Sequence, residues 1–228
     1  MRFTFLTAFL VLTGCATTSS TGSTAVDTVE APPPIVEAPV AEVFEAPPPM
    51  PAPEPQPIGN PALSARATSL VGVPIKRVAP WLPDDCTGLA RAVYEPAGVD
   101  LMTDGVPGDN GVTAIHRVAQ RVGALHTDVP QPGDLVFFRE TYDRNRDGLR
   151  NDGLTHVAVV ERVEPDGEVV FIHRGAKGVE RSRMFVAEPL SRERNDILRV
   201  ASKKERAKLT GELFVDFAAS SRLLAPKR

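Results

Sequence analysis

The sequence has 228 residues, of which 26 are basic and 29 acidic, giving a net charge of −3. This near-balance argues against a nucleic-acid-binding protein that relies on phosphate neutralisation, and two cysteines are too few for a disulfide framework. The hydrophobic content of 42% suffices for a core, but 12 of the 22 prolines lie between Pro32 and Pro61, so the globular part is smaller than the chain.

The first fourteen residues have the pattern of a secretory signal peptide. Met1-Arg2 gives a basic start, an apolar run follows from Phe3 to Leu12, and small residues precede Cys15. The apolar run, about ten residues long, is too short to span a bilayer. Residues 1–14 are therefore expected to be removed from the mature protein.

Leu12-Thr13-Gly14-Cys15 resembles a bacterial lipobox. The resemblance implies cleavage before Cys15 and acylation of its thiol, so the protein is expected in the cell envelope, anchored by lipid. Ala16 resembles the class sorted to the outer membrane, facing the periplasm, if the host has two membranes. An ordinary signal peptide with a chance cysteine, or a buried strand, is the alternative.

Residues 15–63 have the composition of a tether. This segment is rich in Ser and Thr and then in Pro, Ala and Glu, and no basic residue occurs between Arg2 and Arg66. Such a sequence cannot bury enough apolar surface to fold. Polyproline extension of about 3.1 Å per residue would let it present a domain at a distance from a membrane.

Residues 64–228 are expected to form one domain in which helices precede an antiparallel sheet, an α+β fold. Asp84 or Asp85 would cap a first helix over Cys86–Tyr94, and apolar spacing predicts a second over Asp109–Val122. A weaker periodicity predicts a terminal helix over Lys203–Ser220. The strands are expected at Asp134–Phe138, His156–Val163, Glu168–His173, Val179–Val186 and Ile197–Val200, with a hairpin turn at Asp166-Gly167.

Cys86 is the candidate nucleophile. After lipidation of Cys15 it would be the one free thiol in an oxidising compartment, and the start of a helix lowers the pKa of a thiol. The carboxylate of Asp85 opposes this effect, so a histidine base is needed. His156 and His173 lie at the ends of a hairpin and could be neighbours on one face, giving a Cys–His–His set. Structural histidines are the alternative, and His116 and His126 are read as surface or rim residues.

Four segments in this order resemble the NlpC and CHAP families of papain-like cell-wall hydrolases. They are Asp85-Cys86-Thr87-Gly88-Leu89, Pro132-Gly133-Asp134-Leu135-Val136-Phe137-Phe138, His156-Val157-Ala158-Val159-Val160 and Val170-Phe171-Ile172-His173. The resemblance implies a papain-like fold, Cys86 as nucleophile, His156 as base and His173 as the residue that orients it. The spacing of the two histidines is closer to CHAP, whereas a histidine at position 173 is the NlpC-type choice.

The resulting hypothesis is a lipid-anchored hydrolase that cleaves an amide bond in the stem peptide of peptidoglycan. The alternatives are a catalytically silent wall-binding or scaffold lipoprotein, and a cysteine amidase or transferase acting on a non-wall substrate. Serine hydrolase, zinc and nucleotide chemistry lack their motifs. The sequence indicates no nucleic-acid partner and does not fix the oligomeric state.

The loop from Asp143 to Asp152 is similar to the first half of a calcium-binding loop. Oxygen-bearing side chains alternate and Gly148 follows them, but the twelfth position is Leu154 rather than Glu, and three arginines lie within the loop. A polar loop of Asx turns is the favoured interpretation. No cofactor is required by the predicted chemistry, and structural calcium at this loop is the less favoured alternative.

Overall fold

A computed structural model describes residues 59–202 and 205–225. The predicted signal peptide, lipidation site and most of the tether lie outside these residues. In the described part, no helix combines the length and apolar character needed to cross a membrane. The first described helix starts at Pro61 with Asn60 as its cap, three residues before the expected domain boundary at residue 64.

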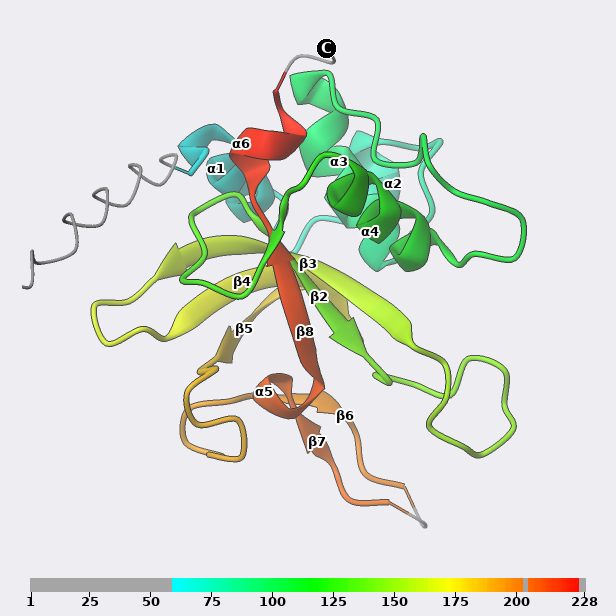
Figure 1. Ribbon diagram of the computed structural model, residues 1–228, viewed down its shortest axis with the longest axis vertical. Coiled ribbons are helices and arrows are strands. Elements are labelled where there is room, and N and C mark those ends of the chain that lie inside the picture. Colours follow the sequence, from blue (N-terminus) through cyan, green and yellow to red (C-terminus); the bar gives the residue numbers. More distant parts are fainter. Residues whose placement is uncertain (1–58, 203–204, 226–228) are drawn as a thin grey trace, which may run out of the picture. The chain divides into compact units, whose positions relative to one another are not determined.

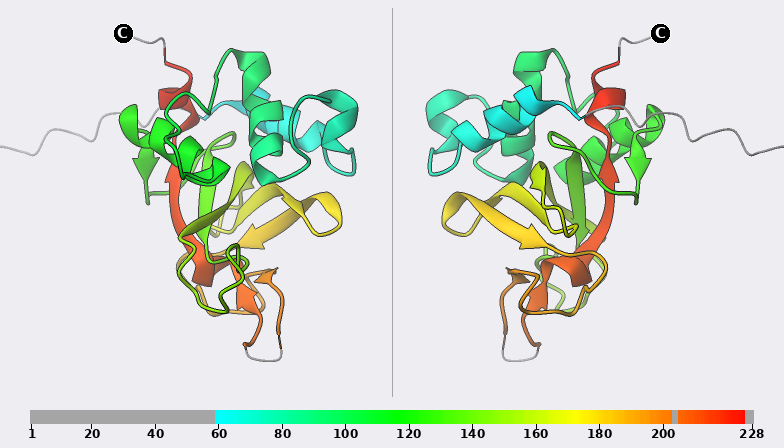
Figure 2. Two further views of the ribbon diagram at one scale, coloured as in Figure 1. Left: turned by 90° about the vertical axis from the view of Figure 1, so that its right-hand side faces the viewer. Right: turned by 90° about the vertical axis from the view of Figure 1, so that its left-hand side faces the viewer.

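Helices gather on one face of the sheet, as Figures 1 and 2 show. Their amphipathic sequences place Leu89 and Val93 of one helix and Ile115 of another in a shared core. The helices of this group are α1 (Pro61–Ser69), α2 (Ile75–Val78), α3 (Cys86–Tyr94), the 3-10 helix η1 (Glu95–Ala97), α4 (Gly111–Arg121) and α6 (Ser220–Leu223).

The main sheet contains six strands in the order β1-β8-β2-β3-β4-β5, and every neighbouring pair is antiparallel. Its strands are β1 (Leu125–His126), β2 (Leu135–Arg139), β3 (Leu154–Val163), β4 (Val169–Gly175), β5 (Gly178–Met184) and β8 (Phe214–Ala218). A second, two-stranded sheet pairs β6 (Ile197–Arg199) with β7 (Lys208–Leu209). The architecture is therefore the α+β arrangement expected.

Both faces of the main sheet are covered, so its central strands carry buried apolar side chains on both faces. Leu135 and Phe137 of β2 belong to the core beneath the helices, whereas Val136 and Phe138 point to a second core on the other face. Leu213 of α5 (Thr210–Leu213) closes that second core. This explains why the sequence of β2 reads as a continuous apolar run rather than an alternating one.

The C-terminal helix predicted over Lys203–Ser220 is wrong. This region forms β7, the short helix α5 and β8, which lies between β1 and β2 in the sheet. Leu213 and Phe217 pack into the second core, so their helix-like spacing arises from two successive elements. The aromatic and β-branched residues of β8 favour a strand once β2 offers its edge.

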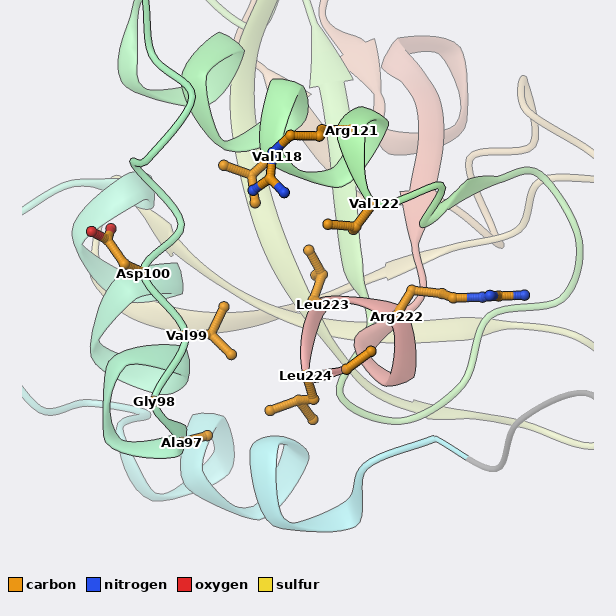
Figure 3. Close-up of a pocket in the computed structure, with 11 residues that line it drawn as sticks. Ala97, Gly98, Val99, Asp100, Val118, Arg121, Val122, Arg222, Leu223 and Leu224 are labelled. Carbon is orange, nitrogen blue, oxygen red and sulfur yellow. The ribbon is translucent and has the colours of Figure 1, made fainter. Parts of the chain in front are cut away.

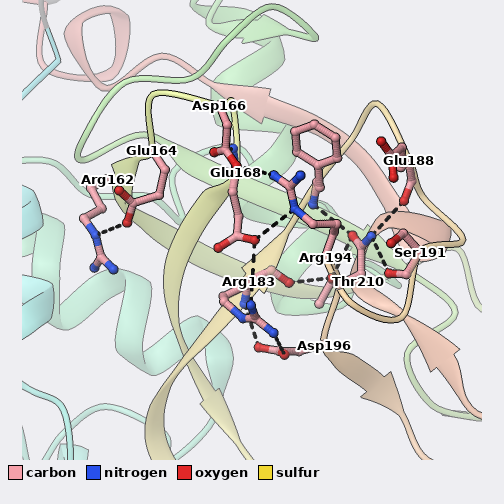
Figure 4. A network of polar contacts seen from close by, with 12 residues as sticks. Arg162, Glu164, Asp166, Glu168, Arg183, Glu188, Ser191, Arg194, Asp196 and Thr210 are labelled. Carbon is pink, nitrogen blue, oxygen red and sulfur yellow. Dashed lines mark hydrogen bonds and ion pairs between the residues drawn. The ribbon is translucent and has the colours of Figure 1, made fainter.

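A polar network fastens the segment after β5 to the β3–β4 turn (Figure 4). Arg194 donates to Asp166 at 2.6 Å and to Glu168 at 3.4 Å, and its guanidinium carbon lies 3.9 Å above the ring centre of Phe185. Asn195, which is buried, accepts from the backbone N–H of Phe185 at 2.9 Å. These contacts hold β4 and β5 where they can present side chains to β3.

Candidate active site

The N-terminus of α3 carries Cys86 as its first residue, where the sequence predicted it. Asp85 caps the helix because its Oδ1 accepts from the backbone N–H of Gly88 at 2.9 Å. Gly88 is required by close packing, since a Cβ there would lie 1.9 Å from the carbonyl oxygen of Pro83. The segment preceding the helix therefore fixes the position of Cys86.

Burial makes Cys86 a thiol at rest, because its effect on the pKa outweighs the lowering that the helix start provides. The free thiol has its pKa raised to about 11, chiefly by burial and further by the charge of Asp85. The backbone N–H groups of Val157, Thr87 and Cys86 itself act in the opposite direction, but more weakly than burial. Because Val157 follows His156, the sulfur lies beside the strand that carries the candidate base.

His156 and His173 are in contact, and both are buried. His156 Nε2 lies 3.0 Å from His173 Nδ1, and their rings meet edge to face. The register pairs Val159 with Ile172 and shifts at Glu161, so a bulge absorbs part of the offset between the two histidines. The two rings are therefore neighbours, as expected.

Both rings are held neutral by their surroundings. Burial, followed by the proximity of His173, lowers the pKa of His156 to about 3. Burial also lowers the pKa of His173 to about 4, although the charges of Glu180 and Asp196 act to raise it. A neutral imidazole with one bare nitrogen is the form that can accept a proton from a thiol.

Sequence reasoning missed Ser182, which continues the chain of contacts. Its Oγ lies 3.1 Å from Nε2 of His173, and the residue is 9% exposed. Ser182 lies on β5, two positions from Glu180, the cross-strand partner of His173. Nothing in the sequence of this polar strand distinguishes Ser182, because its contact depends on strand pairing.

Cys86 and His156 both line a cleft of about 370 Å³. It lies at the N-termini of α3 and α4, against the beginning of β3. Its lining residues are Asp84, Asp85, Cys86, Thr87, Asn110, Gly111, Val112, Tyr142, Thr155, His156 and Arg174. A cleft of this size can admit an extended peptide segment to the sulfur.

The other two histidines do not line this cleft, and both are half-buried, as residues at a rim are. His116 Nε2 lies 2.9 Å from Asp216 Oδ2 and its ring packs edge-on against Phe137. His126 Nε2 is 3.6 Å from Asp134 Oδ2, beyond hydrogen-bonding range. His116 therefore joins α4 to the sheet, whereas the ring of His126 packs against Phe217 within the sheet.

The loop from Asp143 to Asp152 satisfies most of its oxygens internally. Asp147 accepts from the side-chain amides of Asn145 and Asn151, each at 2.9 Å, and Asp152 accepts from the backbone of Arg144 at 3.0 Å. Within residues 59–202 and 205–225, no group of three or more His, Cys, Asp or Glu side chains is arranged to hold a metal ion. Calcium at this loop stays the less favoured alternative, which nothing here tests.

A larger cavity, of about 710 Å³, lies between the end of η1, α4 and α6. Figure 3 shows Val99, Val122, Leu223 and Leu224 directed towards it. None of the candidate catalytic residues lines this cavity, whose wall combines aliphatic side chains with Asp100, Arg121 and Arg222. It is therefore separate from the cleft that holds Cys86.

Residues 78–175 match the family model described as the CHAP domain. This part of the chain is a CHAP domain, and it includes Cys86, His156 and His173 within its bounds. The helices packed against a six-stranded antiparallel sheet agree with the papain-like fold of that family. A CHAP domain indicates peptidoglycan hydrolase or amidase function. Comparison with curated proteins and with solved structures gave no match.

Proposed function

We propose that this CHAP-domain protein is a cell-wall hydrolase that cleaves an amide bond in the stem peptide of peptidoglycan. Cys86 is the nucleophile, His156 the base, and His173 the residue that orients the base. The observation that carries the proposal is the contact between His156 Nε2 and His173 Nδ1, at 3.0 Å, behind a cleft that also exposes Cys86. Because Nε2 of His156 contacts His173, Nδ1 is the ring nitrogen that remains to accept the proton of the thiol.

Cleavage proceeds in two steps. The sulfur of Cys86 attacks the carbonyl carbon while its proton passes to Nδ1 of His156 and then to the leaving amine, so the C–N bond breaks and a thioester forms. Water, deprotonated by His156, attacks the thioester, and the acid product leaves as the sulfur regains its proton. The backbone N–H of Cys86, at the helix start, can donate to the oxyanion.

Cys86 and His156 are both uncharged before substrate binds, and this determines when the proton moves in the first step. With the pKa of Cys86 near 11 and that of His156 near 3, an ion pair is unfavourable before substrate binds. Proton transfer must therefore accompany the attack on the carbonyl. The contact with His173 supports this by holding the ring of His156 in one orientation for the transfer.

The position of the enzyme in the envelope is also part of the proposal. Acylation of Cys15 would fix the chain to a membrane, in the outer membrane facing the periplasm in a diderm host. The Pro-rich segment that follows in the sequence would let the CHAP domain reach the wall. Peptidoglycan is then the expected partner, and the lipid anchor would keep the domain within reach of it.

The proposal is tested by incubating the purified full-length protein with sacculi and analysing released fragments by mass spectrometry. The matched variants are Cys86→Ala, which removes the nucleophile, and Ser64→Ala, which removes a buried hydroxyl elsewhere. Fragments from the wild type and Ser64→Ala, but not from Cys86→Ala, are expected, and their masses name the bond. If all three folded proteins release nothing, a silent wall-binding protein or a non-wall substrate becomes the better explanation.

A further inference from the structure

The hydroxyl of Ser182, on β5, contacts His173 of the histidine pair. Its Oγ lies 3.1 Å from His173 Nε2, and His173 Nδ1 lies 3.0 Å from His156 Nε2. Ser182, His173 and His156 are 9%, 5% and 8% exposed, so water has little access to this chain of contacts. Each of these two contacts therefore needs one donor and one acceptor from among Ser182, His173 and His156 themselves.

Because both rings are neutral at pH 7, each carries one N–H, and the chain can run in only two directions. If Ser182 accepts from His173 Nε2–H, His173 Nδ1 accepts from His156 Nε2–H, and His156 Nδ1 is bare. If Ser182 donates to His173 Nε2 instead, His173 Nδ1–H donates to a bare His156 Nε2. The proton of His156 then lies on Nδ1. Only the first direction leaves a base that can take the proton of Cys86.

The surroundings of the sulfur favour the same direction. The backbone N–H groups of Val157, Thr87 and Cys86 lower the pKa of the thiol, which is the effect of donors near the sulfur. The role left to the thiol is that of a donor, and a donating thiol needs a bare nitrogen on His156. The sulfur and Ser182 therefore lie at opposite ends of one series of hydrogen-bonding groups. Together they can determine which group in it donates and which accepts.

We propose that Ser182 is a positioning residue, whose hydroxyl accepts from His173 Nε2–H and thereby holds His156 with a proton on Nε2 and a bare Nδ1. Its importance for catalysis rests on the proposed cysteine hydrolase function, whereas its effect on the protonation of the two rings does not. Ser182 does not touch substrate and acts through His173.

The test uses the full-length protein labelled with ¹⁵N-histidine, since nitrogen chemical shifts distinguish a bare ring nitrogen from a protonated one. The signals of His156 and His173 are assigned from the His156→Gln and His173→Gln proteins. Three variants are compared with the wild type: Ser182→Ala removes the acceptor, Ser182→Thr retains a hydroxyl, and Ser64→Ala removes a hydroxyl of similar burial that bonds to the carbonyl of Glu161.

A bare Nδ1 on His156 is expected in the wild type, in Ser182→Thr and in Ser64→Ala, with a second population protonated at Nδ1 in Ser182→Ala. In the sacculus assay, kcat of Ser182→Ala should fall roughly tenfold or more with little change in KM, because a wrong tautomer removes the base. A wild-type His156 protonated at Nδ1, or an unchanged ring state in Ser182→Ala, overturns the inference. A correct ring response without any sacculus cleavage contradicts the proposed function and leaves the inference intact.

Discussion

The guanidinium of Arg174, at the end of β4, donates to both carboxylate oxygens of Asp84, two residues before Cys86, at 3.2 and 3.1 Å. This pair connects the segment that leads into α3 with the strand that carries His173. It lines the cleft of Cys86 and also a smaller cavity, of about 150 Å³, on its other side. The Asp84–Arg174 pair therefore forms a wall between the cleft and its neighbour.

Breaking this pair should weaken substrate binding more than chemistry. Asp84→Asn and Arg174→Gln are expected to raise KM for soluble stem peptides by roughly two- to tenfold with kcat little changed, because neither side chain is required at the reacting atoms. Steady-state kinetics measure both constants. Asp166→Asn, which breaks a pair at the distant β3–β4 turn, is the control. An equal fall of kcat in both cleft variants would contradict this role.

The raised pKa of the partly buried Cys86 thiol predicts an unusual pH dependence of alkylation. Since the thiolate is the reactive form and the pKa of Cys86 is about 11, the rate with iodoacetamide should rise about tenfold per pH unit through pH 10. The rate is measured in a Cys15→Ser background so that one thiol is present. A plateau between pH 7 and 9 would mean that the thiolate forms much more easily than its burial indicates.

The histidine pair predicts acid sensitivity of the fold. The pKa values of His156 and His173 lie near 3 and 4 in the folded chain, below the ordinary value of 6.5, so the unfolded chain binds protons first as pH falls. Their contribution therefore lowers the free energy of unfolding progressively below about pH 6.5 and stops growing near the folded pKa values.

Urea unfolding at pH 7 and pH 4.5 measures this loss. The double variant His156→Gln, His173→Gln should be less stable at pH 7, because it disturbs a buried contact, but should lose less stability between the two pH values. A double variant with the full acid loss of the wild type would assign the effect to other groups.

Lipid attachment is tested separately from catalysis. Cys15→Ser should abolish incorporation of labelled palmitate and move the protein from the membrane to the soluble fraction, because the acceptor thiol is gone. Cleavage of isolated sacculi should be unchanged, since Cys86 remains. A Cys15→Ser protein that stays lipidated would show that the similarity to a lipobox is accidental.

Local signals were enough to predict α3 and its chemistry-bearing first residue. Asp85 as cap and the Pro96 and Gly98 that follow the helix gave its bounds at Cys86–Tyr94. The Asp166-Gly167 turn similarly indicated the β3–β4 hairpin, and with it the approach of the two histidines. In each of these cases, neighbours in sequence determine the structure.

The features that the sequence did not reveal depend on distant parts of the chain. β8 is a strand because β1 and β2 flank it in the sheet. In the sequence alone, its apolar residues continue a spacing that is typical of a helix. The pKa of Cys86 is set by the packing of β3 against α3, which no local pattern measures. Ser182 reaches His173 only through the pairing of β4 with β5.

Asp85 has two effects that substitution can separate. Its Oδ1 caps α3 through the N–H of Gly88, and its charge raises the pKa of Cys86. Asp85→Ala should remove both effects and cost about 1 kcal/mol in the free energy of unfolding, as loss of an N-cap commonly does. Asp85→Asn should keep the cap, since an amide oxygen also accepts, while removing the charge. Urea unfolding should therefore distinguish the two variants, whereas alkylation of Cys86 at pH 8 should be faster than wild type in both. Faster alkylation in Asp85→Ala alone would mean that fraying of the helix, rather than the charge of Asp85, controls access to the thiol.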